Sequence, residues 1–251
     1  MPSGSLNTLI AQFDELLHRL EHARQSVKLK ASINVLTNWS SPKKFEKDLL
    51  RTYLDLESPS DRSLLNGLYI VAIASFEEYL RQTLINAIQL KLQRSRNFSD
   101  QKIELIRRNI RSTSRFILDN ESESDYSKIY EACKRLGTCI PESTNLQINE
   151  SAIAIITKIA DLEKFFECLS DIGFKTDWDV LGRDTNMRRC LKTVGQRDTE
   201  KELKEAIKTI RQNRNSIAHT GLTSSNISEA LFAYHLEILQ NVASIIDSRI
   251  N

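Results

Sequence analysis

A short segment near the end of the sequence combines side chains that can hold a phosphate group and move a proton. Arg214, Asn215 and His219 lie within six residues of one another, and Arg211 precedes them by about one helical turn. Imidazole titrates near neutral pH and can therefore donate or accept a proton. A guanidinium stays charged and can bind two oxygen atoms at once. The segment therefore carries the chemistry needed at a phosphate, with Asn215 available to orient a neighbouring group.

The geometry of a helix decides how these side chains can be used together. The segment closes a predicted helix that covers residues 199–218, with Asp198 or Thr199 as its N-cap. In an unbroken helix, Arg214 and His219 would point about 140° apart and would be displaced by roughly 7.5 Å along the axis. One chain can align both on one phosphate only if the helix ends between them. Otherwise, two chains must pair their motifs across a two-fold axis.

Two charged residues interrupt apolar stripes. Arg214 lies on the apolar stripe of its own helix, and Glu77 lies on that of the predicted helix at residues 62–92. A buried, unpaired charge costs several kcal/mol. We therefore expect Glu77 and Arg214 to face each other across the bundle. The alternative is that each long side chain reaches solvent at a helix end.

Hydrophobic periodicity predicts helices along most of the chain and no strand. The segment 62–92 is apolar on nearly every face in its first half, which is typical of a helix at the centre of a bundle. Further helices are expected at residues 6–29, 43–56, 99–118, 126–136, 151–169, 199–218 and 225–250. Residues 137–150 and 171–185 are expected to be irregular. The predicted fold class is all-α, an antiparallel helical bundle.

The composition agrees with this class and limits the function. The 251 residues include only 7 Gly and 4 Pro, too few for the many turns of an all-β protein. A net charge of +2 does not by itself indicate nucleic-acid binding. The longest apolar stretch, at about residues 68–76, is far shorter than the ~20 residues of a membrane span. The N-terminus lacks a basic start followed by an apolar run, so we expect a cytoplasmic protein without membrane contact.

Metal and thiol chemistry are weakly indicated. The four cysteines have neither CxxC nor zinc-finger spacing, which indicates reduced thiols. His18 and His22 are four residues apart on one helix face, but no third ligand is obvious beyond Glu15 or Glu21. We expect no metal and no cofactor.

Two local clusters of arginines could follow a phosphate backbone. One contains Arg107, Arg108 and Arg111, and the other contains Arg188 and Arg189. These residues are predicted to bind RNA. The alternative is a solvated helix face, since aromatic side chains for base stacking are sparse nearby.

The segment Arg214-Asn215-x-x-x-His219 matches the Arg-x4-6-His motif of the HEPN superfamily, including the frequent Asn after the Arg. The sequence RNSIAHTG, followed by a turn and a final helix, resembles HEPN domains of the RiboL-PSP-associated type. Residues 65–80, an apolar run that ends in Phe-Glu-Glu-Tyr-Leu, resemble the helix that these domains carry upstream. In some HEPN toxins the His is followed by x-Tyr, whereas Thr220 and Gly221 follow here, so that variant is not supported.

The resemblance covers mainly residues 61–92 and 199–250. It suggests an N-terminal helical extension at residues 1–57 and a HEPN-like bundle at residues 58–251. The bundle would contain a helical insertion at about residues 99–185, which the resemblance does not match.

The resemblance implies a metal-independent endoribonuclease in which a 2′-hydroxyl attacks the adjacent phosphate. Arg214, His219 and Asn215 would be the catalytic residues, supported by Glu77 and Arg211, and two chains would form a homodimer. The resemblance also implies that the enzyme is a toxin or a phage-defence effector, with an antitoxin or a nucleotidyltransferase as a candidate partner. Two alternatives remain: a non-catalytic HEPN module that binds RNA, a nucleotide or a partner protein, and a purely structural helical scaffold.

Overall fold

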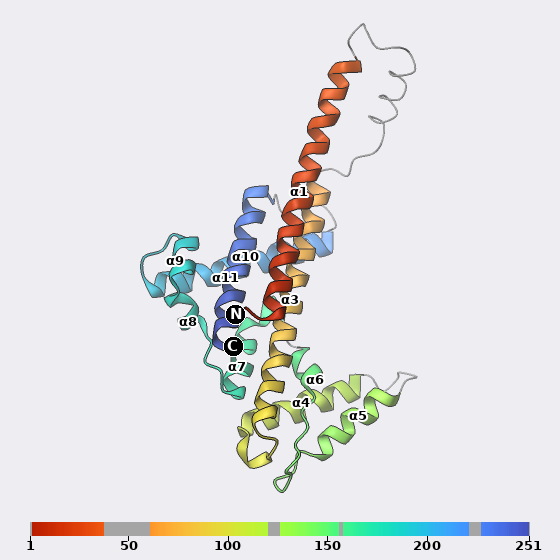
Figure 1. Ribbon diagram of the computed structural model, residues 1–251, viewed down its shortest axis with the longest axis vertical. Helices are drawn as coiled ribbons and strands as arrows, with labels where there is room; N and C mark the ends of the chain where they lie inside the picture. Colours follow the sequence, from red (N-terminus) through yellow and green to blue (C-terminus); the bar gives the residue numbers. More distant parts are fainter. Residues whose placement is uncertain (1, 38–60, 120–125, 156–157, 221–226, 251) are drawn as a thin grey trace.

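The computed structural model describes residues 2–37, 61–119, 126–155, 158–220 and 227–250. Within these ranges every regular element is a helix (Figure 1). The predicted all-α fold class is therefore confirmed. None of the helices in these ranges has an apolar stretch long enough to cross a bilayer.

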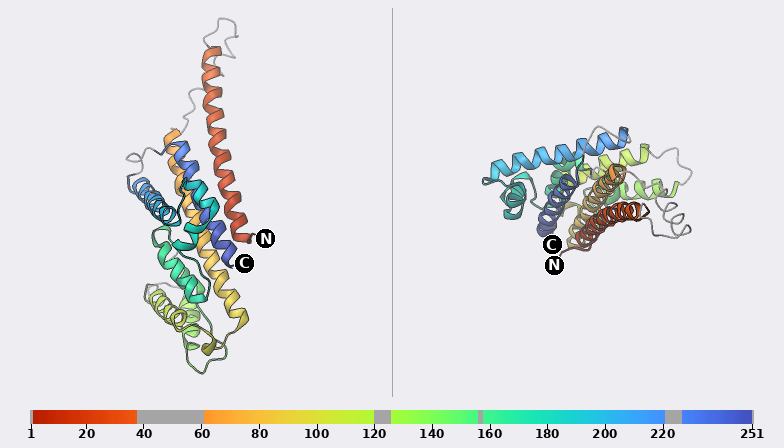
Figure 2. Two further views of the ribbon diagram at one scale, coloured as in Figure 1. Left: turned by 90° about the vertical axis from the view of Figure 1, so that its left-hand side faces the viewer. Right: turned by 90° about the horizontal axis from the view of Figure 1, so that it is seen from above.

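Long helices form the body of the bundle. α1 (Gly4–Thr37) lies beside α3 (Asp61–Arg94) and runs in the opposite direction, and α11 (Glu229–Ile250) packs against both (Figures 1 and 2). α10 (Gln196–Thr220) crosses α3 at a steep angle. Because α3 contacts all the other long helices, it is the central element that its apolar first half predicts.

The core is built mainly on α3. Tyr69 and Phe76 of α3 are buried in one continuous cluster with Phe13 of α1 and Phe232 of α11. Burying one such side chain contributes roughly 1.5–3 kcal/mol. Val71 is 50% exposed, so one face of α3 stays open to solvent.

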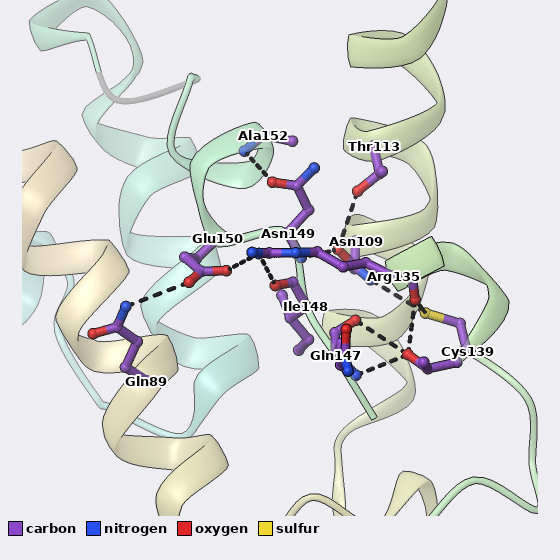
Figure 3. A network of polar contacts seen from close by, with 11 residues as sticks. Gln89, Asn109, Thr113, Arg135, Cys139, Gln147, Ile148, Asn149, Glu150 and Ala152 are labelled. Carbon is purple, nitrogen blue, oxygen red and sulfur yellow. Dashed lines mark hydrogen bonds and ion pairs between the residues drawn. The ribbon is translucent and has the colours of Figure 1, made fainter. Parts of the chain in front are cut away.

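A polar network holds the middle of the chain in place (Figure 3). After η1 (Phe98–Asp100), α4 (Ile103–Asp119) packs against α5 (Tyr126–Gly137) and α6 (Glu150–Ala154). The buried Asn109 of α4 accepts hydrogen bonds at Oδ1 from the Asn149 backbone N–H (2.9 Å) and the Thr113 hydroxyl (3.2 Å). Asn149 Oδ1 in turn accepts from the Ala152 N–H and caps α6.

The same network connects the middle of the chain to α3. Arg135 of α5 donates from Nη1 to the Ile148 carbonyl at 3.1 Å and to Glu150 Oε2 at 2.8 Å. Gln89 of α3 donates to the other oxygen of Glu150 at 3.3 Å. The network therefore joins α5 and α6 to the central helix.

The single helix predicted at residues 151–169 is wrong. The segment contains α6, then η2 (Ile159–Asp161) and α7 (Leu162–Ile172). Lys158 has an extended backbone, with φ −113° and ψ 149°, which breaks the helix. The Ile159 N–H donates to Glu77 Oε1 at 3.1 Å, in place of a helical carbonyl.

The irregular segment predicted at residues 171–185 is also wrong in part. It contains α8 (Trp178–Arg183) and the beginning of α9 (Thr185–Leu191). Asp177 caps α8 by accepting from the Val180 N–H at 2.8 Å, and Asp184 caps α9 in the same way. Each helix is too short to show helical periodicity in the sequence.

Several predicted helix ends are shifted. α10 begins at Gln196, and the Thr199 hydroxyl donates back to the Gly195 carbonyl at 2.8 Å, so neither Asp198 nor Thr199 is its N-cap. α11 begins at Glu229 rather than at residue 225, and Ser228 Oγ accepts the Leu231 N–H at 3.1 Å. The helix predicted at residues 43–56 lies outside the described residues.

Candidate functional site

The segment with Arg214, Asn215 and His219 forms the last turns of α10. The helix is continuous from Gln196 to Thr220, so it does not end between Arg214 and His219. The two side chains therefore point about 140° apart and are displaced by roughly 7.5 Å along the axis. The helix end between the two residues, which would let one chain align both groups on one phosphate, is therefore not present.

The motif side chains are accessible to different degrees. His219 and Arg211 are exposed, whereas Arg214 and Asn215 are half-buried. Arg214 Nη1 donates to Asn215 Oδ1 at 3.3 Å, so the amide orients the guanidinium beside it. Ile217 is buried and anchors the same helical turn to the core.

Glu77 does not pair with Arg214, and the expectation that the two charges face each other in an ion pair is wrong. Among the described residues, no carboxylate forms an ion pair with Arg214. Glu77 Oε1 instead accepts a hydrogen bond from the Ile159 N–H. It supports the break between α6 and α7, and the positive charge of Arg214 stays without a carboxylate partner.

A buried polar group lies directly behind the motif. Tyr69 of α3 bonds through its hydroxyl to His235 Nδ1 of α11 at 2.8 Å, and both side chains are buried. Burial raises the pKa of Tyr69, and a side-chain hydrogen bond with Asn213, the neighbour of Arg214, lowers it by a smaller amount. Burial also lowers the pKa of His235 to about 4, so its ring is neutral at pH 7. In the neutral tautomer that carries its proton on Nε2, the phenol donates to Nδ1. The hydrogen-bonded group connects α3, α11 and the end of α10.

Tyr69 lies in the apolar first half of the helix predicted at residues 62–92, and the hydrophobic pattern of that helix gives no sign of this polar group. His235 lies beside the apolar stripe of α11, and its buried position indicates a structural role. No spacing along one element can reveal a contact that joins three helices far apart in the sequence.

The predicted RNA-binding arginines lie away from the motif. α4, with Arg107, Arg108 and Arg111, packs against α5, α6 and α7. α9, with Arg188 and Arg189, lies at the opposite end of α10 from His219 (Figure 1). Within one chain, these clusters and the motif do not form one compact site.

The arginines of the two clusters also differ in how they are bonded. Arg108 forms an ion pair with Asp171 at 2.8 Å, and Arg188 donates a hydrogen bond from Nε to the Gly182 carbonyl at 3.2 Å. Arg107, Arg111 and Arg189 are exposed, and in the described part of the chain none of them forms an ion pair.

Residues with metal-binding side chains are not gathered at the motif. Across the described ranges, no group of three His, Cys, Asp or Glu side chains is placed to hold a metal ion. His18 and His22 contact each other edge to face, with ring centroids 4.5 Å apart.

A family comparison identifies the class of protein. The family model described as RiboL-PSP-HEPN matches residues 43–251. Since this is most of the chain, the protein belongs to the RiboL-PSP-HEPN family, a HEPN family with an all-α fold. The match runs through residues 99–185, which the resemblance had left unmatched. Searches of curated proteins and of solved structures found no match.

The division of the chain at residue 58 and the roles of Arg214, Asn215 and His219 stay predictions. The three residues lie together at the end of α10, and their side chains can bind a phosphate and transfer a proton.

Proposed function

We propose that this protein is a metal-independent endoribonuclease whose catalytic residues are Arg214, Asn215 and His219. The observation that carries the proposal is the state of the motif at the end of α10. Arg214 has no carboxylate partner among the described residues, and His219 is exposed in the last turn of the same helix. An unneutralised guanidinium from one chain and an accessible imidazole from a second suit a phosphodiester, which brings the negative charge that the arginine lacks.

The chemistry assigns one task to each side chain. The 2′-oxygen of the RNA attacks the adjacent phosphorus, and the bond from phosphorus to the 5′-oxygen breaks. A His219 imidazole accepts the proton from the 2′-hydroxyl and gives it to the leaving 5′-oxygen. Arg214 stabilises the charge that develops on the phosphate oxygens, and Asn215 orients its guanidinium. The products are a 2′,3′-cyclic phosphate and a 5′-hydroxyl.

The continuous helix argues that the site is shared between two chains. Because Arg214 and His219 point about 140° apart on α10, one copy presents either group, but not both, to a given phosphate. A second copy related by a two-fold axis brings the missing group to the same point. In this arrangement the protein acts as a homodimer. Its use as a toxin or a defence effector, silenced by an antitoxin or a nucleotidyltransferase, is part of the same proposal.

RNA cleavage in the presence of a metal chelator tests the proposal. The His219→Ala variant should lose about 10²–10⁴-fold in rate, which is what a general acid or base contributes. His22→Ala is the matched control, because His22 is also exposed but lies on α1. Fragments from the wild type should end in cyclic phosphates. Equal rates for the two variants, or RNA binding by the wild type without cleavage, would reject the nuclease, and the latter would favour a non-catalytic binding module.

A further inference from the structure

The outer face of α4 carries a row of arginines beside a hollow. Arg107, Arg111 and Arg115 follow one another at four-residue intervals, so each lies about 6 Å further along the helix axis. Together with Lys164 of α7, they border a hollow of about 420 Å³ between α4 and α7. We call this the α4–α7 hollow.

The base of the hollow is an ion-pair cluster that fixes its shape. Arg108 pairs with Asp171 at 2.8 Å and lies 3.7 Å from Glu167, and it is only 24% exposed. Both carboxylates belong to α7, so the cluster joins α4 to α7. Cys168 lies beside it, and burial raises the pKa of this thiol to about 12, so it stays neutral at pH 7.

The remaining charges show which groups are available for a ligand. Lys164 pairs with Asp161 at 2.9 Å, and Arg115 lies 3.4 Å from Asp119. Arg107 and Arg111 are exposed, and in the described ranges neither forms an ion pair. The other acidic side chain in the hollow is Glu104, so cationic groups outnumber acidic ones there. Two guanidiniums one turn apart are thus left to bind an anion.

We propose that the α4–α7 hollow binds the phosphodiester backbone of an RNA strand, with Arg107 and Arg111 each contacting one phosphate. Each guanidinium can grip two phosphate oxygens, and their axial separation of about 6 Å suits groups that repeat along a strand. Arg108 is a positioning residue, because its ion pairs with Glu167 and Asp171 hold α4 against α7. The proposal rests on the proposed function, since it assumes that RNA is the substrate.

The position of the hollow gives this site a distinct role. It lies between α4 and α7 and shares no residue with the motif at the end of α10, so an RNA that occupies both sites must be long enough to span them. The hollow would therefore improve binding of long RNA without contributing to the cleavage step. In cleavage assays, its loss should raise KM for long RNA and leave kcat unchanged.

Binding measured as a function of salt concentration tests the hollow directly. All variants are made in the His219→Ala background, and a single-stranded RNA of fixed length is titrated by fluorescence anisotropy. The double variant Arg107→Gln/Arg111→Gln should reduce the slope of log K against log salt by about 1.4, since each phosphate contact on a single strand contributes about 0.7. The control is Arg19→Gln/Arg81→Gln, which removes the same charge from two arginines outside the hollow that pair with glutamates on their own helices.

The results test RNA binding at the hollow separately from the proposed nuclease activity. A reduced slope in the Arg107/Arg111 variant alone supports the hollow, even if the wild type fails to cleave RNA. An unchanged slope, or an equal reduction in the control, overturns the hollow, even if the wild type does cleave RNA. Circular dichroism checks the fold, which should be intact because neither arginine has an ion-pair partner in the described ranges.

Discussion

Lowering the pH from 7 to 4 is expected to destabilise the bundle through one buried imidazole. His235 is 3% exposed, and its ring accepts a hydrogen bond from Tyr69 only while it is neutral at Nδ1. Protonation would place a positive charge in the core between α3 and α11. Because Tyr69 also bonds Asn213, the end of α10 that carries Arg214 would lose its support at the same time.

The size and sign of the effect follow from the two pKa values. The pKa of His235 falls from its ordinary value of 6.5 to about 4 in the fold. Between these values the unfolded chain binds more protons than the folded chain, so the free energy of unfolding falls as the pH is lowered. At about 1.4 kcal/mol per pH unit, the loss approaches about 3 kcal/mol at pH 4, and nearly all of it lies below pH 6.5.

Urea unfolding at a series of pH values measures this loss. Carboxylates also titrate in this pH range and change the free energy of unfolding. The wild type is therefore compared with His235→Gln, because the carboxylates contribute equally to the free energy of unfolding of both proteins. The difference in free energy between the two proteins should shrink by about 3 kcal/mol from pH 7 to pH 4. His22→Gln, at an exposed position, should follow the wild type. Parallel curves for the wild type and His235→Gln would refute the assignment of a neutral, buried His235.

Two further predictions concern the packing that places α10. Glu77→Ala should lower the free energy of unfolding by about 1–3 kcal/mol because the Ile159 N–H loses its acceptor, whereas Glu77→Gln keeps an acceptor and should cost less; urea unfolding checks both. Gly182→Ala should destabilise the fold by about 1–3 kcal/mol, because a Cβ there would lie 2.9 Å from the Gln196 carbonyl oxygen. Gly67→Ala, in open space within α3, should stabilise the fold by roughly 0.5–1 kcal/mol. Thermal unfolding of both variants tests this contrast, and equal shifts in Tm would contradict it.

The long helices could be predicted because their sequences are strongly periodic. The apolar first half of α3 predicts that helix, and the buried Leu203, Ile207, Ile210 and Ile217 at helical spacing predict α10. The short α8 and α9 could not be found, because six and seven residues give too few turns for a period. Their capping residues, Asp177 and Asp184, were the available signal.

Local pattern also explains why the candidate site could be predicted only in part. Arg214, Asn215 and His219 stand close together in the sequence, so their spacing on one helix was enough to identify them. The partner of Glu77 is a backbone N–H at Ile159, which no spacing of charges reveals. The contact between Tyr69 and His235 joins residues 166 positions apart, and such pairing depends on how the helices pack.

Mixing two inactive variants tests most directly whether two chains share the catalytic site. Arg214→Ala and His219→Ala are prepared separately, each is assayed alone, and the two are then mixed under conditions that exchange subunits. Each alone should be inactive, and random mixing should restore about a quarter of the wild-type RNA cleavage, because half of the dimers then carry one intact site. If the mixture stays as inactive as its components, or if either variant alone cleaves RNA like the wild type, the shared Arg214–His219 site is contradicted.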